Sequence, residues 1–299
     1  MTMSNPSYQG VYTALITPMR GEEILWDVLK SHVEGQIAAG VDGLVPVGTT
    51  GESPTLDTAE HLKVIETVAE VANGRVPVIA GTGANATSEA LHLSKEAIKA
   101  GADALLQVAP YYNKPSQEGL YRHFAKVAES TDKPIILYSI PGRCGIEIGV
   151  GTVQRLAENF PHVRTIKEAG GDVSRVTALR AACGDKLTVL CGDDGLILPF
   201  ISAGASGIVS VAANLGPAII KAITSAMLQG QQAKALELQD QYLPLLTDVV
   251  FMEGNPVTIK EAMAHLGRIP TADVRLPLCH MESGNRNRLH QILDRLNLS

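Results

Sequence analysis

Residues 37–47 read IAAGVDGLVPV, and the same design returns at residues 98–108 as IKAGADALLQV and at residues 201–211 as ISAGASGIVSV. In each copy a helix-like segment meets a glycine and then a run of apolar, β-forming residues. Glycine adopts the left-handed backbone at low cost, so this glycine is predicted to end a helix just before a buried strand begins. The three glycines are Gly40, Gly101 and Gly204.

Short apolar runs of this kind alternate with amphipathic segments along most of the chain, which is typical of repeated βα units. The eight runs begin near Tyr12, Gly43, Pro77, Ala104, Pro134, Arg164, Leu187 and Gly207. Eight such units close a (β/α)8 TIM barrel, the α/β fold predicted for residues 1–228. Residues 229–299 show only helical patterns and are expected to form a C-terminal helical appendage packed on the barrel. An open, doubly wound sheet is the alternative, because periodicity does not report closure.

Composition narrows the possible partners. The 299 residues are 45% hydrophobic with a formal net charge of −6, and no run of Lys or Arg offers a footprint for nucleic acid. The uncharged stretch 195–220 is interrupted by prolines and glycines, which argues against a membrane span. The first ten residues lack the basic and apolar regions of a signal peptide, so a cytoplasmic protein is expected. The four cysteines show no metal-binding spacing, and we expect no metal.

Lys167 is the strongest catalytic candidate. The active site of a TIM barrel lies at the carboxyl ends of its strands, and Lys167 alone among twelve lysines falls inside a predicted strand. Burial lowers the pKa of an amine and frees it to attack a carbonyl and form a Schiff base. A lysine paired with a carboxylate at the barrel rim is the alternative. Alternation places Glu168 on the opposite face of the strand, so Glu168 is not expected to be the direct partner of Lys167.

Other polar groups are predicted at neighbouring strand ends. Tyr138 falls on the inner face of its strand and could carry protons with Thr49 and Tyr112, although it could also be a core tyrosine. The segment 48–52, GTTGE, offers backbone N–H groups and hydroxyls to a carboxylate, unless it is only a turn. Arg143 is suited to bidentate binding of a second carboxylate, with a solvated surface arginine as the competing interpretation.

Seven motifs, in order from about Val11 to Leu278, carry a family resemblance. They are GTTGESPTL, GTGANAT, PYYNKPSQEGLYRHF, YSIPGRCG, IKEAGGD, GDDG and RLPL. With them the chain resembles the 4-hydroxy-tetrahydrodipicolinate synthases, also called dihydrodipicolinate synthases, more than the N-acetylneuraminate lyases. The resemblance implies a lyase of lysine and diaminopimelate biosynthesis that condenses pyruvate with L-aspartate 4-semialdehyde through a lysine Schiff base, without a cofactor.

The resemblance also implies residue roles. The residues expected to form the imine and the proton relay are Lys167, Tyr138, Thr49 and Tyr112. The residues expected to bind carboxylates are Thr50 and the backbone of Val209 for pyruvate, and Arg143 for the semialdehyde. In the family, the tyrosine that matches Tyr112 reaches into a neighbouring subunit of a homotetramer described as a dimer of dimers.

Three positions depart from the family pattern. Ser139 and Cys144 stand where asparagine and threonine are common, and both flank Arg143. These two departures keep open another pyruvate-dependent class I aldolase or lyase acting on a sugar acid or hydroxyproline derivative. The alternative of a different class is a non-catalytic barrel that binds a keto acid. Thr58 replaces a histidine of lysine-sensitive members, so weak or absent inhibition by lysine is expected. The positions that match the lysine site are Pro54, Thr58, His61, Asn85, Glu89 and Tyr111.

Overall fold

The structure is a computed structural model, and it describes residues 8–296 and residue 298. Residues 1–7, which carry most of the segment searched for a signal peptide, lie outside the described residues, as do 297 and 299. Within the described part of the chain, no helix combines the length and the apolar character needed to cross a membrane.

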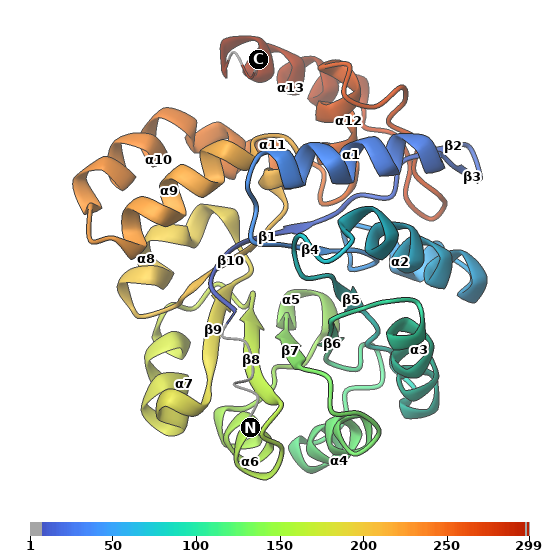
Figure 1. The fold of residues 1–299 in the computed structure, drawn as a ribbon. Helices are drawn as coiled ribbons and strands as arrows, with labels where there is room; N and C mark the ends of the chain where they lie inside the picture. Colours follow the sequence, from blue (N-terminus) through green and yellow to red (C-terminus); the bar gives the residue numbers. More distant parts are fainter. Residues whose placement is uncertain (1–7, 297, 299) are drawn as a thin grey trace.

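Eight parallel strands form the central sheet, in the order β4-β1-β10-β9-β8-β7-β6-β5. Their bounds are β1 Gly10–Ala14, β4 Gly43–Val45, β5 Ile79–Gly81, β6 Ala104–Val108, β7 Ile135–Ser139, β8 Val163–Glu168, β9 Thr188–Cys191 and β10 Gly207–Ser210. A parallel bridge between Leu44 and Val78 joins the two ends of this order and closes the ring (Figure 1). The predicted barrel is confirmed, and the open sheet is wrong.

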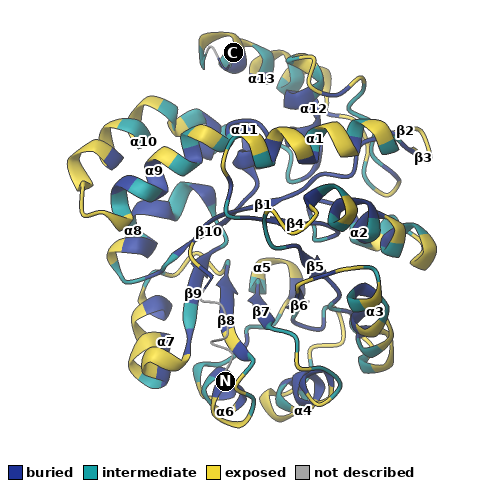
Figure 2. Cartoon of the chain, viewed as in Figure 1, coloured by how far each residue is buried: buried dark blue, intermediate teal, exposed yellow. Residues whose placement is uncertain are grey.

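Helices surround this ring. They are α1 Trp26–Ala38, α2 Thr58–Ala72, α3 Thr87–Lys99, α4 Gln117–Ala128, α5 Pro141–Cys144, α6 Val150–Asn159, α7 Ser174–Cys183, α8 Ile197–Ser202 and α9 Pro217–Leu228, with short 3-10 turns η1 Ser53–Thr55, η2 Gly184–Lys186, η3 Asp194–Leu196 and η4 Ala212–Asn214. Strands buried on both faces read as continuous apolar runs, which is why the pattern located them. Figure 2 shows the buried strands inside and the exposed residues on the outer helix faces.

The repeated segments behave as predicted. Gly40, Gly101 and Gly204 follow α1, α3 and α8 with φ angles of +81°, +97° and +105°, and β4, β6 and β10 begin within three residues of them. Each glycine therefore ends a helix in the left-handed conformation and turns the chain into the barrel.

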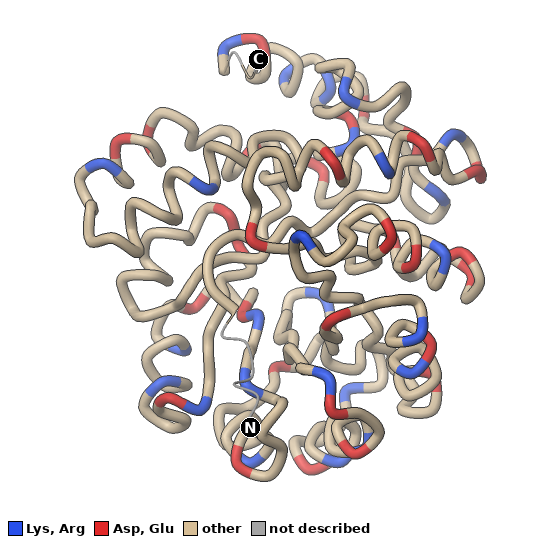
Figure 3. The backbone as a smooth tube through the Cα atoms, in the orientation of Figure 1, with Lys and Arg blue, Asp and Glu red and all other residues tan. Residues whose placement is uncertain are grey.

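The C-terminal region is helical after Gln229, with α10 Gln232–Leu246, α11 Asp248–Phe251, α12 Val257–His265 and α13 Ser283–Leu296. Helix α10 packs on α9, and α12 packs on α13. A short antiparallel pair, β2 Met19–Arg20 and β3 Glu23–Ile24, was not predicted, because two residues are too few to show a period of two. Acidic and basic residues alternate over the outer helices (Figure 3).

Candidate active site

Lys167 lies in β8 between two neighbours of the ring, opposite Tyr138 on β7 and Leu190 on β9. Its side chain is buried, and Nζ lies 4.1 Å from the centre of the Tyr138 ring. Among the described residues, no carboxylate oxygen lies within 4.0 Å of this amine, so the structure gives no support to an ion pair at the rim. Glu168 points the other way and pairs with Arg175 at 3.0 Å, as strand alternation predicts.

Gly192, directly after β9, provides the space that Lys167 occupies. A methyl group built at Gly192 would lie 3.0 Å from Cε of Lys167 and 2.6 Å from Cβ of Ala169. Such distances are too short for ordinary packing, so any side chain here would displace the lysine or the strand end.

Two cavities that share a wall open at the carboxyl ends of the strands. The smaller has a volume of about 50 Å³ and is lined by Lys167, Thr50 and Asn255. The larger, of about 240 Å³, is lined by Tyr111 and Cys144. The residues common to both linings include Thr49, Tyr138 and Arg143. Five of the predicted site residues, from four separate segments, thus meet in one place.

The GTTGE segment forms a tight turn after β4. The N–H groups of Gly51 and Glu52 donate to the main-chain oxygens of Gly48 and Thr49, each at 3.1 Å. Thr50 is buried, and its Oγ1 accepts a hydrogen bond from Asn255 Nδ2 at 2.9 Å. The turn therefore presents two hydroxyl groups close to Lys167 without regular secondary structure.

Asn255 lies in the C-terminal region, and sequence reasoning missed it. Its main-chain oxygen accepts a hydrogen bond from Arg143 Nη2 at 3.0 Å, while its amide reaches Thr50. Val250 and Phe251 of α11 line the same cavity. No local pattern could have revealed these contacts, because Thr50 and Asn255 are 205 positions apart.

Asp194 is a second missed residue. It lines the smaller cavity, and its carboxylate accepts from Ser210 Oγ and from the N–H groups of Val211 and Ala212 at 2.9 and 3.1 Å. Burial raises the pKa of Asp194 to about 6, although these hydrogen bonds oppose the shift. Its carboxylate therefore holds the segment that follows β10.

Two predicted residues do not line the described cavities. The side chain of Tyr112 is 90% exposed, with a φ angle of +73°, whereas its neighbour Tyr111 lines the larger cavity. Val209 is buried within β10, two residues before Val211, which lines the smaller cavity.

Ser139 and Cys144, the two residues near Arg143 that differ from the family pattern, lie in different surroundings. Ser139 is fully buried, and its hydroxyl accepts a hydrogen bond from the N–H of Ile148 at 3.3 Å. Cys144 lines the larger cavity, and burial raises the pKa of its thiol to about 11. Of the two, Cys144 is therefore the one that touches the cavity beside Arg143.

The positions expected to bind lysine spread outward from the larger cavity. Pro54 and Tyr111 line it, and burial, followed by the nearby charge of Glu89, raises the pKa of Tyr111. His61 is buried, with Nε2 2.8 Å from the main-chain oxygen of Gly81. Three of the positions, Pro54, Thr58 and Glu89, are exposed, and Asn85 is half-buried.

The side chains that could bind a metal ion are His, Cys, Asp and Glu. In the described ranges, 8–296 and 298, no group of three or more His, Cys, Asp or Glu side chains is placed to hold a metal ion.

A buried lysine at the carboxyl end of a barrel strand, against a tyrosine ring and beside a hydroxyl-bearing turn, is an arrangement typical of Schiff-base-forming aldolases and lyases. The model of the Dihydrodipicolinate synthetase family matches residues 7–296. The chain belongs to this family.

Individual relatives are similar to this chain over nearly its whole length. The 4-hydroxy-tetrahydrodipicolinate synthase of Methanocaldococcus jannaschii is 45% identical and covers 97% of this chain and 99% of its own. The structure of the synthase from Methylacidiphilum fumariolicum SolV superposes with a TM-score of 0.95 at 46% identity, covering 97% of this chain and 96% of that one. The structure of the chloride-inhibited synthase from Acinetobacter baumannii, complexed with pyruvate, superposes with a TM-score of 0.94 at 40% identity. It covers 98% of this chain and 100% of that one.

Proposed function

We propose that this chain condenses pyruvate with L-aspartate 4-semialdehyde to give 4-hydroxy-tetrahydrodipicolinate, through an imine at Lys167. One observation carries the proposal: the amine of Lys167 is buried beside Tyr138, and no described carboxylate lies within ion-pair distance. A lysine held in this way is available as a nucleophile. Family membership and the activity named for the relatives support the same reaction.

The chemistry proceeds in balanced steps. The neutral amine of Lys167 attacks the keto carbon of pyruvate, and the carbinolamine loses water to form an imine. The imine loses a methyl proton and becomes an enamine, whose carbon attacks the aldehyde of the second substrate. The amino group of that substrate then displaces Lys167 by transimination, which closes the ring and restores the free amine.

Proton transfers accompany each step, and Tyr138 is the group best placed for them. Its ring lies 4.1 Å from the amine, and Thr49 lines both cavities with it. A hydroxyl within hydrogen-bond reach of the carbinolamine can give a proton to the leaving water and take one back.

Two carboxylates need partners. Thr50 and the backbone of Val209 would hold the carboxylate of pyruvate in the smaller cavity, and Arg143 would bind that of the semialdehyde. The position of Arg143 in the wall shared by both cavities supports this division.

The proposal includes a homotetramer, a dimer of dimers in which Tyr112 completes the proton relay of a neighbouring subunit. Tyr112 is 90% exposed, on a left-handed residue of the loop that follows β6. A large aromatic side chain held outward by an unusual backbone conformation is suited to insertion into a partner.

The test uses purified protein with both substrates, the product being reduced by a coupled NADPH-dependent reductase. Steady turnover is expected, and borohydride should trap the pyruvate imine on Lys167 as a mass increase. Lys167→Ala should abolish both signals. Trapping of pyruvate without turnover would favour an aldolase with another second substrate, and neither signal would favour a non-catalytic barrel.

A further inference from the structure

Glu52, the last residue of the GTTGE turn, is a buried carboxylate in a left-handed backbone conformation, with a φ angle of +57°. A residue other than glycine stays in this region only where its surroundings hold it there. The N–H of Glu52 also donates to the main-chain oxygen of Thr49. The conformation of Glu52 therefore sets the position of Thr49 in the turn.

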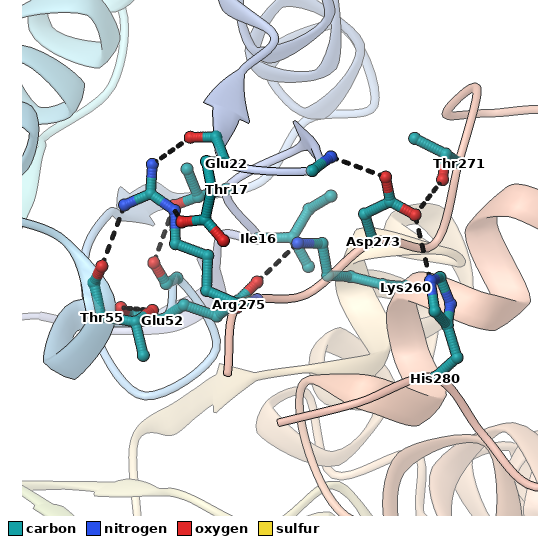
Figure 4. A network of polar contacts seen from close by, with 12 residues as sticks. Ile16, Thr17, Glu22, Glu52, Thr55, Lys260, Thr271, Asp273, Arg275 and His280 are labelled. Carbon is teal, nitrogen blue, oxygen red and sulfur yellow. Dashed lines mark hydrogen bonds and ion pairs between the residues drawn. The ribbon is translucent and has the colours of Figure 1, made fainter. Parts of the chain in front are cut away.

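Two residues of the C-terminal region hold the Glu52 carboxylate (Figure 4). Nζ of Lys260, in α12, lies 2.5 Å from Oε1, and the main-chain N–H of Arg275 donates to Oε2 at 3.1 Å. Both partners of the ion pair are fully buried, so neither charge can exchange its partner for water. A buried charge that loses its partner is strongly unfavourable, which makes this contact resistant to rearrangement.

Arg275 is itself fixed from the other side. Its guanidinium binds the carboxylate of Glu60 through Nη1 and Nη2 at 2.5 and 2.6 Å, and Nη1 donates to the main-chain oxygen of Thr55 at 2.9 Å. Thr55 lies in η1, three residues after the turn, and Glu60 lies in the first turn of α2. The segment from Glu52 to the start of α2 is therefore attached along its length to the C-terminal region.

We infer that Lys260 and Arg275 are positioning residues for the pyruvate end of the active site, acting through Glu52 on the turn that carries Thr49 and Thr50. The inference rests on the proposed function, which gives these two threonines their roles. Neither Lys260 nor Arg275 lines the described cavities, so any influence on substrate passes through the turn.

A purely structural role would give a different kinetic result. If Lys260 only attached the C-terminal region to the barrel, its loss would reduce the fraction of folded enzyme. Fewer active molecules lower the maximal rate but leave the KM of the remaining molecules unchanged. A displaced turn instead weakens pyruvate binding in every folded molecule, and this difference separates the two roles.

The experiment compares Lys260→Met with Lys221→Met, a matched loss of a lysine that pairs with Asp42 at the amino end of the strands. For Lys260→Met we expect the pyruvate concentration that half-saturates borohydride trapping, and the pyruvate KM, to rise about tenfold. The KM for the semialdehyde should change by less than about twofold, as should every constant of Lys221→Met. An unchanged pyruvate KM with only a lower maximal rate would overturn the inference.

A double-mutant cycle with Thr50→Val provides the second measurement. If Lys260 acts through the turn, Lys260→Met should hardly change the half-saturating pyruvate concentration once Thr50→Val has removed the hydroxyl. Additive effects of the two substitutions would contradict the inference. Should Lys260→Met fail to fold, Glu52→Gln replaces it, because glutamine keeps the shape of the glutamate side chain. This variant must also raise the pyruvate concentration that half-saturates trapping and the pyruvate KM. Failure of the wild type to trap pyruvate would instead count against the proposed function.

Discussion

Arg143 donates a hydrogen bond from Nη2 to the main-chain oxygen of Asn255 at 3.0 Å, although the two residues are 112 positions apart. The amide of the same asparagine reaches Thr50. The two groups proposed to bind the two substrate carboxylates thus have one partner in common. The distance between the two carboxylate sites depends on where the C-terminal region places Asn255.

Asn255→Ala should weaken pyruvate binding. It removes the hydrogen bond to Thr50 Oγ1 but keeps the main-chain oxygen that Arg143 contacts, so the pyruvate KM should rise about fivefold, near 1 kcal/mol, with a smaller change for the semialdehyde. Steady-state kinetics measure both constants. Asn159→Ala, at an exposed asparagine that bonds Arg155 O, is the control. Equal changes in both KM values would count against a selective effect on Thr50.

Gly192→Ala should slow imine formation. The added methyl would press on Cε of Lys167 and Cβ of Ala169, so we expect kcat to fall by at least about tenfold while the barrel still folds. Stopped-flow or quenched borohydride trapping measures the rate. Gly151→Ala, on α6 with no atoms near the added carbon, should behave as wild type. A normal trapping rate in Gly192→Ala would show that Lys167 does not need this space.

Asp194→Asn should change how stability depends on pH. The pKa of Asp194 is about 6 in the folded protein against 3.8 as the ordinary value, so between these values the folded state binds more protons than the unfolded state. Stability therefore falls as pH rises through this window, by roughly 3 kcal/mol for this group. Urea unfolding near pH 4 and near pH 7 measures the free energy of unfolding of both proteins. The value for the variant minus the value for the wild type should increase with pH. A difference independent of pH would refute this assignment.

Tyr112→Phe should lose most turnover, and a mixing experiment tests whether the tyrosine acts in a neighbouring subunit. Lys167→Ala should be inactive but still offers Tyr112, whereas Tyr112→Phe retains Lys167. Mixed oligomers would contain some complete sites, so activity should return when the two inactive variants exchange subunits. Native mass spectrometry confirms the exchange. Mixed oligomers without activity would contradict the shared site.

Lysine should inhibit the enzyme weakly or not at all at millimolar concentration. Thr58 is exposed in the first turn of α2, at the position where the family resemblance implies a histidine in lysine-sensitive members. Initial rates across a lysine titration measure this, with Thr58→His as the comparison that should become more sensitive. Strong inhibition of the wild type would show that the other five matching positions suffice.

Local patterns predicted the parts of this protein that depend on local physics. Gly40, Gly101 and Gly204 identified the helix-to-strand turns because few other residues tolerate that backbone conformation. Lys167 stood out because a charged residue inside an apolar strand needs a reason. The alternation of β8 also separated Lys167 from Glu168 correctly.

Long-range contacts could not be predicted in this way. Lys260 sits in a helix, where a lysine is usually solvated, and only the packing of α12 buries it against Glu52 from 208 positions away. Asn255 likewise has no periodic or charge pattern that connects it to Thr50. The role proposed for Tyr112 rests on the family resemblance, because it involves a neighbouring subunit rather than a contact within this chain.

The place of Asn255 and Lys260 in the chain also bears on synthesis at the ribosome. All eight barrel strands have been made once Ser210 is added, yet the turn that carries Thr49 and Thr50 receives its fixed partners only when residues 255–275 follow. A nascent or prematurely ended chain can thus possess the barrel and the lysine before the pocket is organised. Reactivity toward keto acids would then be acquired last, after the scaffold that has to contain it.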